Sequence, residues 1–280
     1  MDIGIGLPAT IPGLAGADLL EWARRADARG FSTLGTIDRL VYGNYEPLIA
    51  LAAAAAVTER IGLTTAIMIA PFRLNAALIA KQAATVHHLS GGRLTLGVAV
   101  GGREDDYEAS GADFHRRGKE FDRMLDRWAE VWGGDEIGPK PPGGRPGLLI
   151  GGGADAVFER AAKHADGWIM GGGTPERFAG ALDKTRTAWS AAGRDGSPRT
   201  AALAYFALGD GAREAADAYL GDYYAFLGEY AQAIASSAAV DEDTVRAYVD
   251  GFAAVGCDEL ILFPCSTDPD QVDRLADAVL

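Results

Sequence analysis

The sequence contains no uncharged apolar run of the ~18 residues that are needed to cross a membrane. The longest candidate, PLIALAAAAAV at residues 47–57, is too short and rich in alanine, so we expect a packed helix there. The chain begins at once with a strand pattern, without a basic segment or an apolar secretory core. These absences predict a cytoplasmic protein that has no membrane as a partner.

Basic residues and cysteines are also scarce. The chain has 26 Lys and Arg against 39 Asp and Glu, a formal net charge of -13. Nucleic acids and anionic membranes bind basic patches, so this balance disfavours both as partners. The two cysteines, Cys257 and Cys265, flank a predicted strand that would hold them too far apart to form a disulfide. We expect reduced, buried thiols in a reducing compartment.

Several catalytic motifs are missing. There is no G-x-S-x-G elbow and no Walker phosphate loop. His87 and His88 are neighbours on a predicted helix, so they cannot share a metal as an i, i+4 pair would, and we predict no metal site. GIGLPA at residues 4–9 formally matches a dinucleotide fingerprint, but Pro8 interrupts it and the next helix starts only near Asp18.

Short apolar runs alternate with helical patterns along the whole chain. The runs predict strands at residues 2–7, 31–37, 61–70, 93–100, 147–151, 167–171, 200–208 and 259–263. Helical spacing predicts helices at 18–29, 76–89, 118–132, 154–164 and 175–192, and two helices within 219–251. A last helix is expected after Asp268 as N-cap, with Pro269 at its first position and Gln271 completing a capping box.

Continuous apolar strands separated by helices predict a parallel sheet that is covered on both faces. Eight such units in about 250 residues fit a (β/α)₈ TIM barrel, and the alternative is an open, doubly wound sheet. The count of eight favours the barrel. The Pro/Gly-rich stretch at 138–147 is interpreted as a loop, and no linker or repeat divides the chain, so we expect a single domain over residues 1–280.

Two glycine triplets, at residues 151–153 and 171–173, each stand between a predicted strand and a helix. A helix N-terminus offers unpaired N–H groups, and glycine lets that backbone approach an anion closely. In a barrel such loops lie on the catalytic face. The triplets therefore indicate a phosphate site. The alternative is that they are only tight turns, since the chain contains 37 glycines.

One segment is more specific: LIAKQAATVHHLSGGRLTLGVAVGGREDDYEASG at residues 78–111. It resembles the bacterial-luciferase-like superfamily of flavin and deazaflavin oxidoreductases, which typically carry a helix A-K-Q-x-A-T-x-D-x-L-S-G-G-R before a strand L-G-V-G-x-G. The segments ADARGFSTLGTIDRL, HADGWI and DPDQVDRLADAV agree in the same order. The resemblance implies a luciferase-like TIM barrel, a cofactor across its carboxyl-terminal mouth, and a homodimer. Such proteins use reduced FMN with O₂, or coenzyme F420 for hydride transfer.

The resemblance also implies where a cofactor is held. Its phosphate is expected at the loops after strands five and six, and its ring over strand three, where many members have a non-proline cis peptide. The residues that match these positions or lie beside them are Leu7, Ala66, Ile67, Gly97, Gly101, Gly152, Gly153, Ala154, Gly171, Gly172 and Gly173.

Two positions depart from the deazaflavin members. Many of them have Asp-His after strand two where this chain has Asp38 and Arg39, our candidate catalytic residues. Some have Glu at the end of strand four, where this chain has Gly102. Arg39 stays protonated, so it cannot act as an acid or base, but it could bind an anionic substrate or stabilise a negative oxygen. The alternative for Arg39 is a structural ion pair with Asp38.

Three further groups surround the expected site. We interpret His87 and His88 as structural residues at a helix C-terminus. The acids of GREDDY, residues 102–107, are either solvated or placed so that Glu104 or Asp105 meets a cationic substrate or Arg39. Candidate substrate-contacting aromatic residues are Tyr42, Tyr45, Phe72, Tyr107 and Phe206.

The two missing proton-handling groups favour an FMN-dependent monooxygenase that acts on a small, largely apolar or aromatic molecule, with a separate flavin reductase as partner. The alternatives are an F420-dependent reductase or dehydrogenase and a non-catalytic flavin-binding protein. A further alternative, an aldolase-like barrel, needs a Schiff-base lysine at a strand end. The few lysines lie mainly in predicted helices and loops, which disfavours it.

Overall fold

Eight parallel strands close into a barrel in the order β1 to β8, with β8 pairing β1. The computed structural model describes residues 1–280. The strands are β1 (Asp2–Gly6), β2 (Thr33–Thr36), β3 (Gly62–Ile69), β4 (Leu94–Ala99), β5 (Gly147–Gly151), β6 (Gly167–Met170), β7 (Arg199–Phe206) and β8 (Glu259–Pro264). The closed barrel confirms the TIM-barrel prediction and rejects the open sheet.

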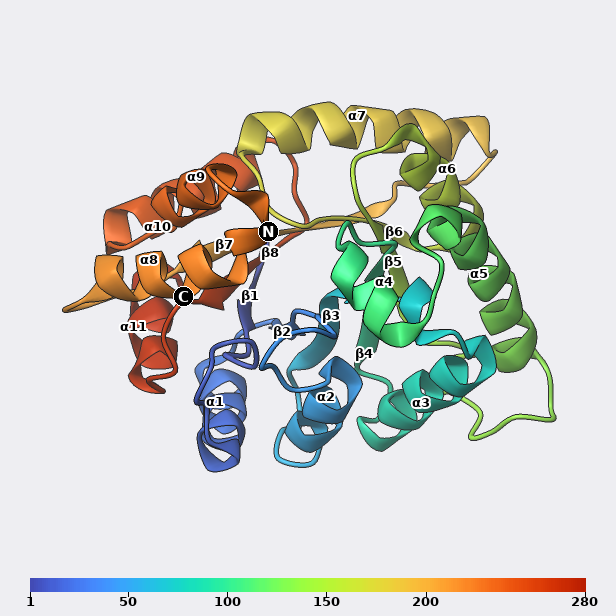
Figure 1. Cartoon of the computed structure of the whole chain (residues 1–280), viewed down its shortest axis with the longest axis horizontal. Coiled ribbons are helices and arrows are strands. Elements are labelled where there is room, and N and C mark those ends of the chain that lie inside the picture. Colours follow the sequence, from blue (N-terminus) through green and yellow to red (C-terminus); the bar gives the residue numbers. More distant parts are fainter.

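Helices surround the barrel and follow its strands in turn (Figure 1). They are α1 (Gly16–Arg29), α2 (Pro47–Ala55), α3 (Ala76–Leu89), α4 (Glu104–Ser110), α5 (Arg117–Gly133), α6 (Asp155–His164), α7 (Pro175–Ala191), α8 (Ala212–Tyr223), α9 (Tyr230–Ser236), α10 (Glu242–Ala254) and α11 (Asp270–Val279). The predicted helices are confirmed to within a few residues, except at 219–251, where two helices were expected and three, α8, α9 and α10, are found, the first of which begins at Ala212. None of them combines the length and apolar character that crossing a membrane requires.

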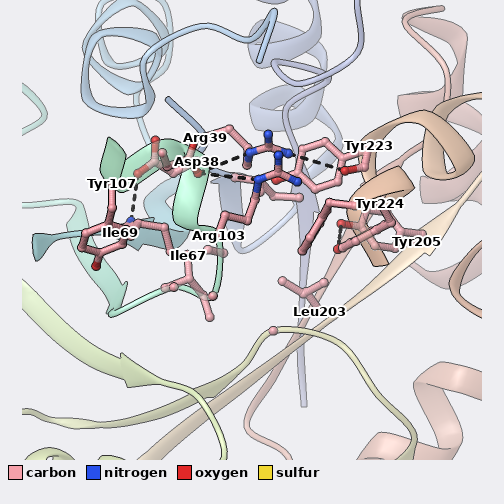
Figure 2. A pocket seen from close by; sticks show the side chains of 17 residues that line it. Asp38, Arg39, Ile67, Ile69, Arg103, Tyr107, Leu203, Tyr205, Tyr223 and Tyr224 are labelled. Carbon is pink, nitrogen blue, oxygen red and sulfur yellow. Dashed lines mark hydrogen bonds and ion pairs between the residues drawn. The ribbon is translucent and has the colours of Figure 1, made fainter. Parts of the chain in front are cut away.

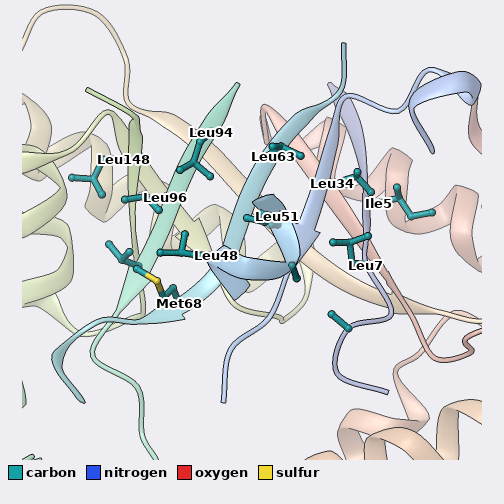
Figure 3. Close-up of a cluster of buried hydrophobic side chains, with 14 of the residues drawn as sticks. Ile5, Leu7, Leu34, Leu48, Leu51, Leu63, Met68, Leu94, Leu96 and Leu148 are labelled. Atoms are coloured by element: carbon teal, nitrogen blue, oxygen red, sulfur yellow. The ribbon is translucent and has the colours of Figure 1, made fainter. Parts of the chain in front are cut away.

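The core has two layers because successive residues of a strand face opposite sides of the sheet. The outer layer lies between barrel and helices, and Figure 3 shows part of it, with Leu34, Leu63 and Leu96 of the strands beside Leu51 of α2. The inner layer lies within the barrel and includes Leu149 of β5. Burial of both faces explains the nearly continuous apolar runs that predicted these strands.

Phe263 of β8 fills the barrel interior where glycines make room for its ring. A Cβ at Gly6 would lie 2.2 Å from its Cδ1 atom, and one at Gly35 would lie 2.8 Å from its Cζ atom. Such distances are far inside van der Waals contact, so both positions require glycine. With the interior packed, an open cavity can form only beyond the strand ends.

The predicted capping box before α11 is wrong. The helix begins at Asp270 with Pro269 as N-cap, and Asp268 Oδ1 accepts a hydrogen bond from the Asp270 N–H at 3.0 Å. The Gln271 side chain does not reach back to the cap. It is buried and bonds the backbone N–H and C=O of Leu208 at 2.8 and 2.7 Å. The Gln271 side-chain amide, which the sequence pattern assigned to the helix cap, therefore bonds the buried backbone after β7 instead.

Two smaller predictions concern histidine and cysteine. The His87 ring is buried at the end of α3, 3.1 Å from the carbonyls of Leu94 and Pro142, which confirms a structural role. Cys257 and Cys265 are buried free thiols, as expected. Burial raises the pKa of both to about 12, so neither is a reactive thiolate near neutral pH.

Candidate active site

A cavity of about 280 Å³ opens beyond the carboxyl ends of the strands. Figure 2 shows Arg39 and Arg103 between Asp38 and Tyr107 on one side and three tyrosines on the other. The site residues predicted from the sequence that line it are Asp38, Arg39, Ala66, Ile67, Gly101, Tyr107 and Gly171. The lining residues that the sequence did not single out include Ile69, Arg103, Asp106, Leu203, Tyr205, Tyr223, Tyr224 and Phe226.

Asp38 follows β2 and is held by the neighbouring strand end. Its Oδ2 accepts a hydrogen bond from the Ile69 N–H at 2.8 Å, and its Oδ1 accepts one from Arg73 at 3.2 Å. Only 1% of the side chain is exposed. This burial raises the pKa of Asp38 to about 6, against the opposing positive charge of Arg73. Asp38 is therefore a carboxyl group that can exchange a proton near neutral pH.

Arg39 does not pair with Asp38, so the alternative of an ion pair between these neighbours is wrong. Its Nη2 donates to the Val41 carbonyl at 2.8 Å, and its Nε lies 3.4 Å from Asp106 Oδ2. Its guanidinium lies 5.2 Å from the Tyr42 ring centroid and 5.5 Å from that of Tyr223. The side chain is only 5% exposed. Arg39 is thus a fixed positive charge that already has a counter-ion.

Asp106 is a site residue that the sequence analysis missed. It comes from the first turn of α4, is buried, and its Oδ1 accepts hydrogen bonds from the N–H groups of Leu40 and Val41 at 3.0 and 2.7 Å. It therefore fixes the β2–α2 loop that carries Arg39. The three consecutive acids at 104–106 were a signal that one of them could face inward, but the sequence alone does not say which.

Asp105 meets Arg39 as one alternative predicted, at 3.7 Å, while Glu104 makes no ion pair. Asp105 also bonds Arg103, whose Nε donates to its Oδ1 at 3.0 Å. Arg103 in turn lies over the Phe226 ring, 4.0 Å from its centroid. Each arginine at the cavity therefore faces a carboxylate, which weakens the expectation that Arg39 receives an anionic substrate.

An aromatic wall closes the opposite side of the cavity. Tyr205 comes from β7, while Tyr223 and Tyr224 come from the end of α8. The rings of Tyr223 and Tyr224 meet edge to face at 4.9 Å, and those of Tyr205 and Tyr224 at 6.1 Å. Tyr223 and Tyr224 lie in the 219–251 segment, for which the sequence predicted only helices. The concentration of aromatic residues there could have identified it as a cavity wall.

Of the five predicted substrate contacts, only Tyr107 lines the cavity, and its hydroxyl donates to the Val100 carbonyl at 2.5 Å. Phe72 packs behind Tyr107, with centroids 6.0 Å apart. The Tyr42 ring meets Tyr223 beneath Arg39, and its hydroxyl donates to Asp222.

The other two lie elsewhere. The Tyr45 hydroxyl donates to the Leu14 carbonyl at 3.0 Å, outside the cavity wall. Phe206 is fully buried in the outer core. It sits on β7 one residue after Tyr205, so it faces the helices instead of the interior.

Of the residues implied for the cofactor ring, some line the cavity and others do not. The peptide between Ala66 and Ile67 is cis, as the resemblance implies, and both residues line the cavity. Gly97 does not line it: a Cβ there would lie 2.2 Å from the Thr65 carbonyl oxygen, so this glycine permits close approach of β3 and β4. Leu7 is buried in the outer core and does not reach the cavity.

Gly171 joins the cavity to two further hollows. One, of about 460 Å³, is lined by Gly152, Gly153, Gly171, Gly172, Arg177 and Lys184. The other, of about 650 Å³, is lined by Gly171, Gly172, Gly173 and Arg177 and shares Leu203, Tyr205 and Tyr224 with the cavity. Residues of both glycine triplets therefore line the smaller hollow, which meets the cavity at Gly171, and the two hollows together are called the groove below.

This groove has features that suit a phosphate. Gly152, Gly172 and Gly173 have φ angles of 126°, 112° and 146°, which side chains rarely adopt. Helix α6 starts after Ala154, whose side chain cannot cap it, so N–H groups of its first turn lack a side-chain acceptor. Arg177 makes no ion pair within the protein, whereas Lys184 pairs with Asp155 at 2.9 Å.

Comparison with known proteins identifies the family to which this chain is similar. A family model for luciferase-like monooxygenases matches residues 1–261. An uncharacterized protein of Mycobacterium tuberculosis is 32% identical over 192 residues, which are 56% of this chain and 66% of that relative. The match therefore spans just under two thirds of the relative's length.

Two solved structures share the barrel over almost the whole chain. The monooxygenase RslO1 from Streptomyces bottropensis has a TM-score of 0.79 and 22% identity, covering 99% of this chain and 97% of its own. An F420-dependent secondary alcohol dehydrogenase, solved with an F420-acetone adduct, has a TM-score of 0.84 and 18% identity, covering 99% and 98%. At these identities the likeness shows the fold alone.

Proposed function

The chain belongs to the luciferase-like monooxygenase family, and from that premise we propose that it is a flavin-dependent oxidoreductase whose cofactor lies along the groove. Gly152, Gly153, Gly172 and Gly173, the first turn of α6 and Arg177 would hold the phosphate. Ile67, Gly101 and Gly171 would border the ring. When bound, reduced FMN would supply activation of O₂, and F420 would supply a hydride.

The charged groups of the cavity are the observation that favours FMN-dependent oxygenation over F420-dependent hydride transfer. Arg39 occupies the position where a proton-exchanging histidine is expected for F420 chemistry, and Asp106 and the aromatic rings hold it in place. Both arginines face carboxylates, and the remaining walls are mainly apolar and aromatic. This arrangement favours an FMN-dependent monooxygenase that takes a small, uncharged, largely apolar or aromatic molecule.

One observation favours the second candidate, an F420-dependent reductase or dehydrogenase. F420 carries further negative charge beyond its phosphate. Arg177 has no ion-pair partner and lines both hollows beside the glycine triplets, where it could meet this charge. Asp38, with its pKa raised to about 6, would then be the group that exchanges a proton at the cavity.

A titration of the whole protein with FMN and with F420, read by thermal shift, separates the candidates. We expect FMN to stabilise the protein by mass action and the reduced complex to consume O₂ faster when a substrate is present. Tight binding of F420 with indifference to FMN would replace the monooxygenase by the second candidate. Cofactor binding without any substrate-dependent oxidation indicates a flavin-binding protein, and binding of neither cofactor contradicts the assignment.

We further propose that the chain is a single domain that acts in the cytoplasm as a homodimer, with reduced flavin supplied by a separate reductase. The dimer is supported by apolar side chains on two neighbouring helices, since Ile49 on α2 is 64% exposed and Leu78 on α3 is 48% exposed. Light scattering tests it: the wild type should elute at twice the 29.3 kDa chain mass, and Ile49→Asp with Leu78→Asp should elute as a monomer.

A further inference from the structure

Two tyrosine hydroxyls meet at the wall that the cavity shares with the larger hollow. The Oη atoms of Tyr205 and Tyr224 are 2.7 Å apart, although the residues come from β7 and the end of α8. Figure 2 shows the two hydroxyls facing each other, and both residues line the cavity. No ion pair or backbone group shares this contact.

The two hydroxyls have more protons to donate than the hydrogen bond between them uses. Each hydroxyl has one proton to donate, and a single hydrogen bond between the two uses one of them. Neither oxygen makes another hydrogen bond within the protein. One O–H group of the pair is therefore left without an acceptor, in a wall of the cavity. A ligand oxygen that accepts this proton therefore gains a hydrogen bond that replaces no bond within the protein.

The surrounding rings hold the pair in one position. Tyr205 packs against Tyr219 and Phe263, with centroids 6.3 and 6.4 Å away, and Tyr224 packs against Tyr223. Burial raises the pKa of both hydroxyls above the ordinary value of tyrosine. Both therefore stay protonated at neutral pH, and the ring packing fixes the positions of their oxygens.

The charged groups of the cavity do not compete for the same ligand atom. Arg39 faces Asp105 and Asp106, and Arg103 bonds Asp105. Asp38 is bonded by Arg73 and the Ile69 N–H. A ligand carboxylate would have to displace one of these partners, whereas a neutral oxygen can accept from the tyrosine pair without breaking any existing bond.

We propose that the Tyr205–Tyr224 pair donates a hydrogen bond to an uncharged carbonyl or ether oxygen of the substrate. The pair thereby selects small apolar or aromatic molecules that carry such an oxygen over hydrocarbons of the same shape. The proposal rests on the proposed function in one respect, that this cavity receives the substrate.

Acetophenone and α-methylstyrene are suitable probes, because they differ mainly in a carbonyl oxygen against a methylene group. Their dissociation constants are measured by calorimetry on the whole protein, both free and loaded with whichever cofactor it binds. The variants are Tyr205→Phe, Tyr224→Phe and the double variant. Tyr219→Phe is the matched control, because Tyr219 is buried in the same cluster, bonds Thr10 at 2.5 Å and does not line the cavity.

The double variant should weaken acetophenone binding about five- to tenfold and leave α-methylstyrene binding within about twofold. The single variants identify the hydroxyl that donates outward, and the control should change neither probe. Equal losses for both probes, or no loss for acetophenone, would overturn the proposal. So would a discrimination that disappears once cofactor is bound, because the donor then serves the cofactor.

The test remains decisive if the proposed function fails. Cofactor binding is measured in the same samples, and binding of neither FMN nor F420 contradicts the proposed function alone. The comparison of the two probes on the cofactor-free protein still decides whether the tyrosine pair recognises an oxygen. A variant that loses the cooperative unfolding of the wild type is replaced by the other single variant.

Discussion

Replacement of Asp106 tests how the cavity holds its charges. In Asp106→Ala the N–H groups of Leu40 and Val41 lose their acceptor, and Arg39 loses the carboxylate that lies 3.4 Å from its Nε. Two partly buried donors at about 1 kcal/mol each, plus a 5% exposed arginine that keeps only the more distant Asp105 as a counter-ion, give a loss of about 2–4 kcal/mol. Asp106→Asn keeps the acceptor and should lose about half as much.

Urea unfolding at neutral pH, followed by the fluorescence of the five tryptophans, measures this loss. Asp105→Asn is the matched control, because its side chain is 41% exposed and such pairs contribute about 0–1 kcal/mol. An Asp106→Ala protein within about 0.5 kcal/mol of wild type would refute the reasoning. So would an Asp105→Asn protein that is destabilised as much as Asp106→Ala.

Two further predictions concern pH and backbone packing. The raised pKa of Asp38 means that its protonated form is favoured by the fold, so its stabilising contribution is present below the ordinary value of 3.8 and is lost as the pH rises through about 6. The unfolding free energy of the wild type should therefore fall relative to that of Asp38→Asn as the pH rises through this range. A difference between the two proteins that does not depend on pH would contradict the raised pKa of Asp38. Gly97→Ala places a Cβ 2.2 Å from the Thr65 carbonyl and should lose about 1–3 kcal/mol or more, whereas Gly153→Ala, with no atom within 4 Å, should melt like the wild type. Equal melting temperatures would show that β3 and β4 can separate freely.

The sequence predicted the fold well because each strand carries its own local signal. Buried parallel strands are apolar on both faces, and glycines, prolines and helical spacing mark their ends. The prediction failed where a side chain has two competing partners. Gln271 fits a capping box by spacing, but only the folded chain brings Leu208 close enough to take its amide.

The site was predictable only where it follows the strand ends. Asp38 and Gly171 come directly after strands, so the barrel alone places them at the mouth. Tyr224 and Phe226 come from a long insertion, and nothing in their spacing says where its helices fold back. Asp106 needed the orientation of α4, because three adjacent acids differ only in the direction that each faces.

The most direct test of the cofactor groove is the affinity of the whole protein for FMN and F420 before and after Gly172→Ala. A Cβ at φ 112° strains the glycine triplet at 171–173, which is proposed to hold the phosphate. We therefore expect the wild type to bind one cofactor tightly and the variant to lose about tenfold or more in affinity. Gly143→Ala, a glycine at φ 69° in another loop with no neighbour within 4 Å, should bind like wild type. Unchanged affinity in Gly172→Ala, or no binding of either cofactor by the wild type, would contradict the assignment of this groove.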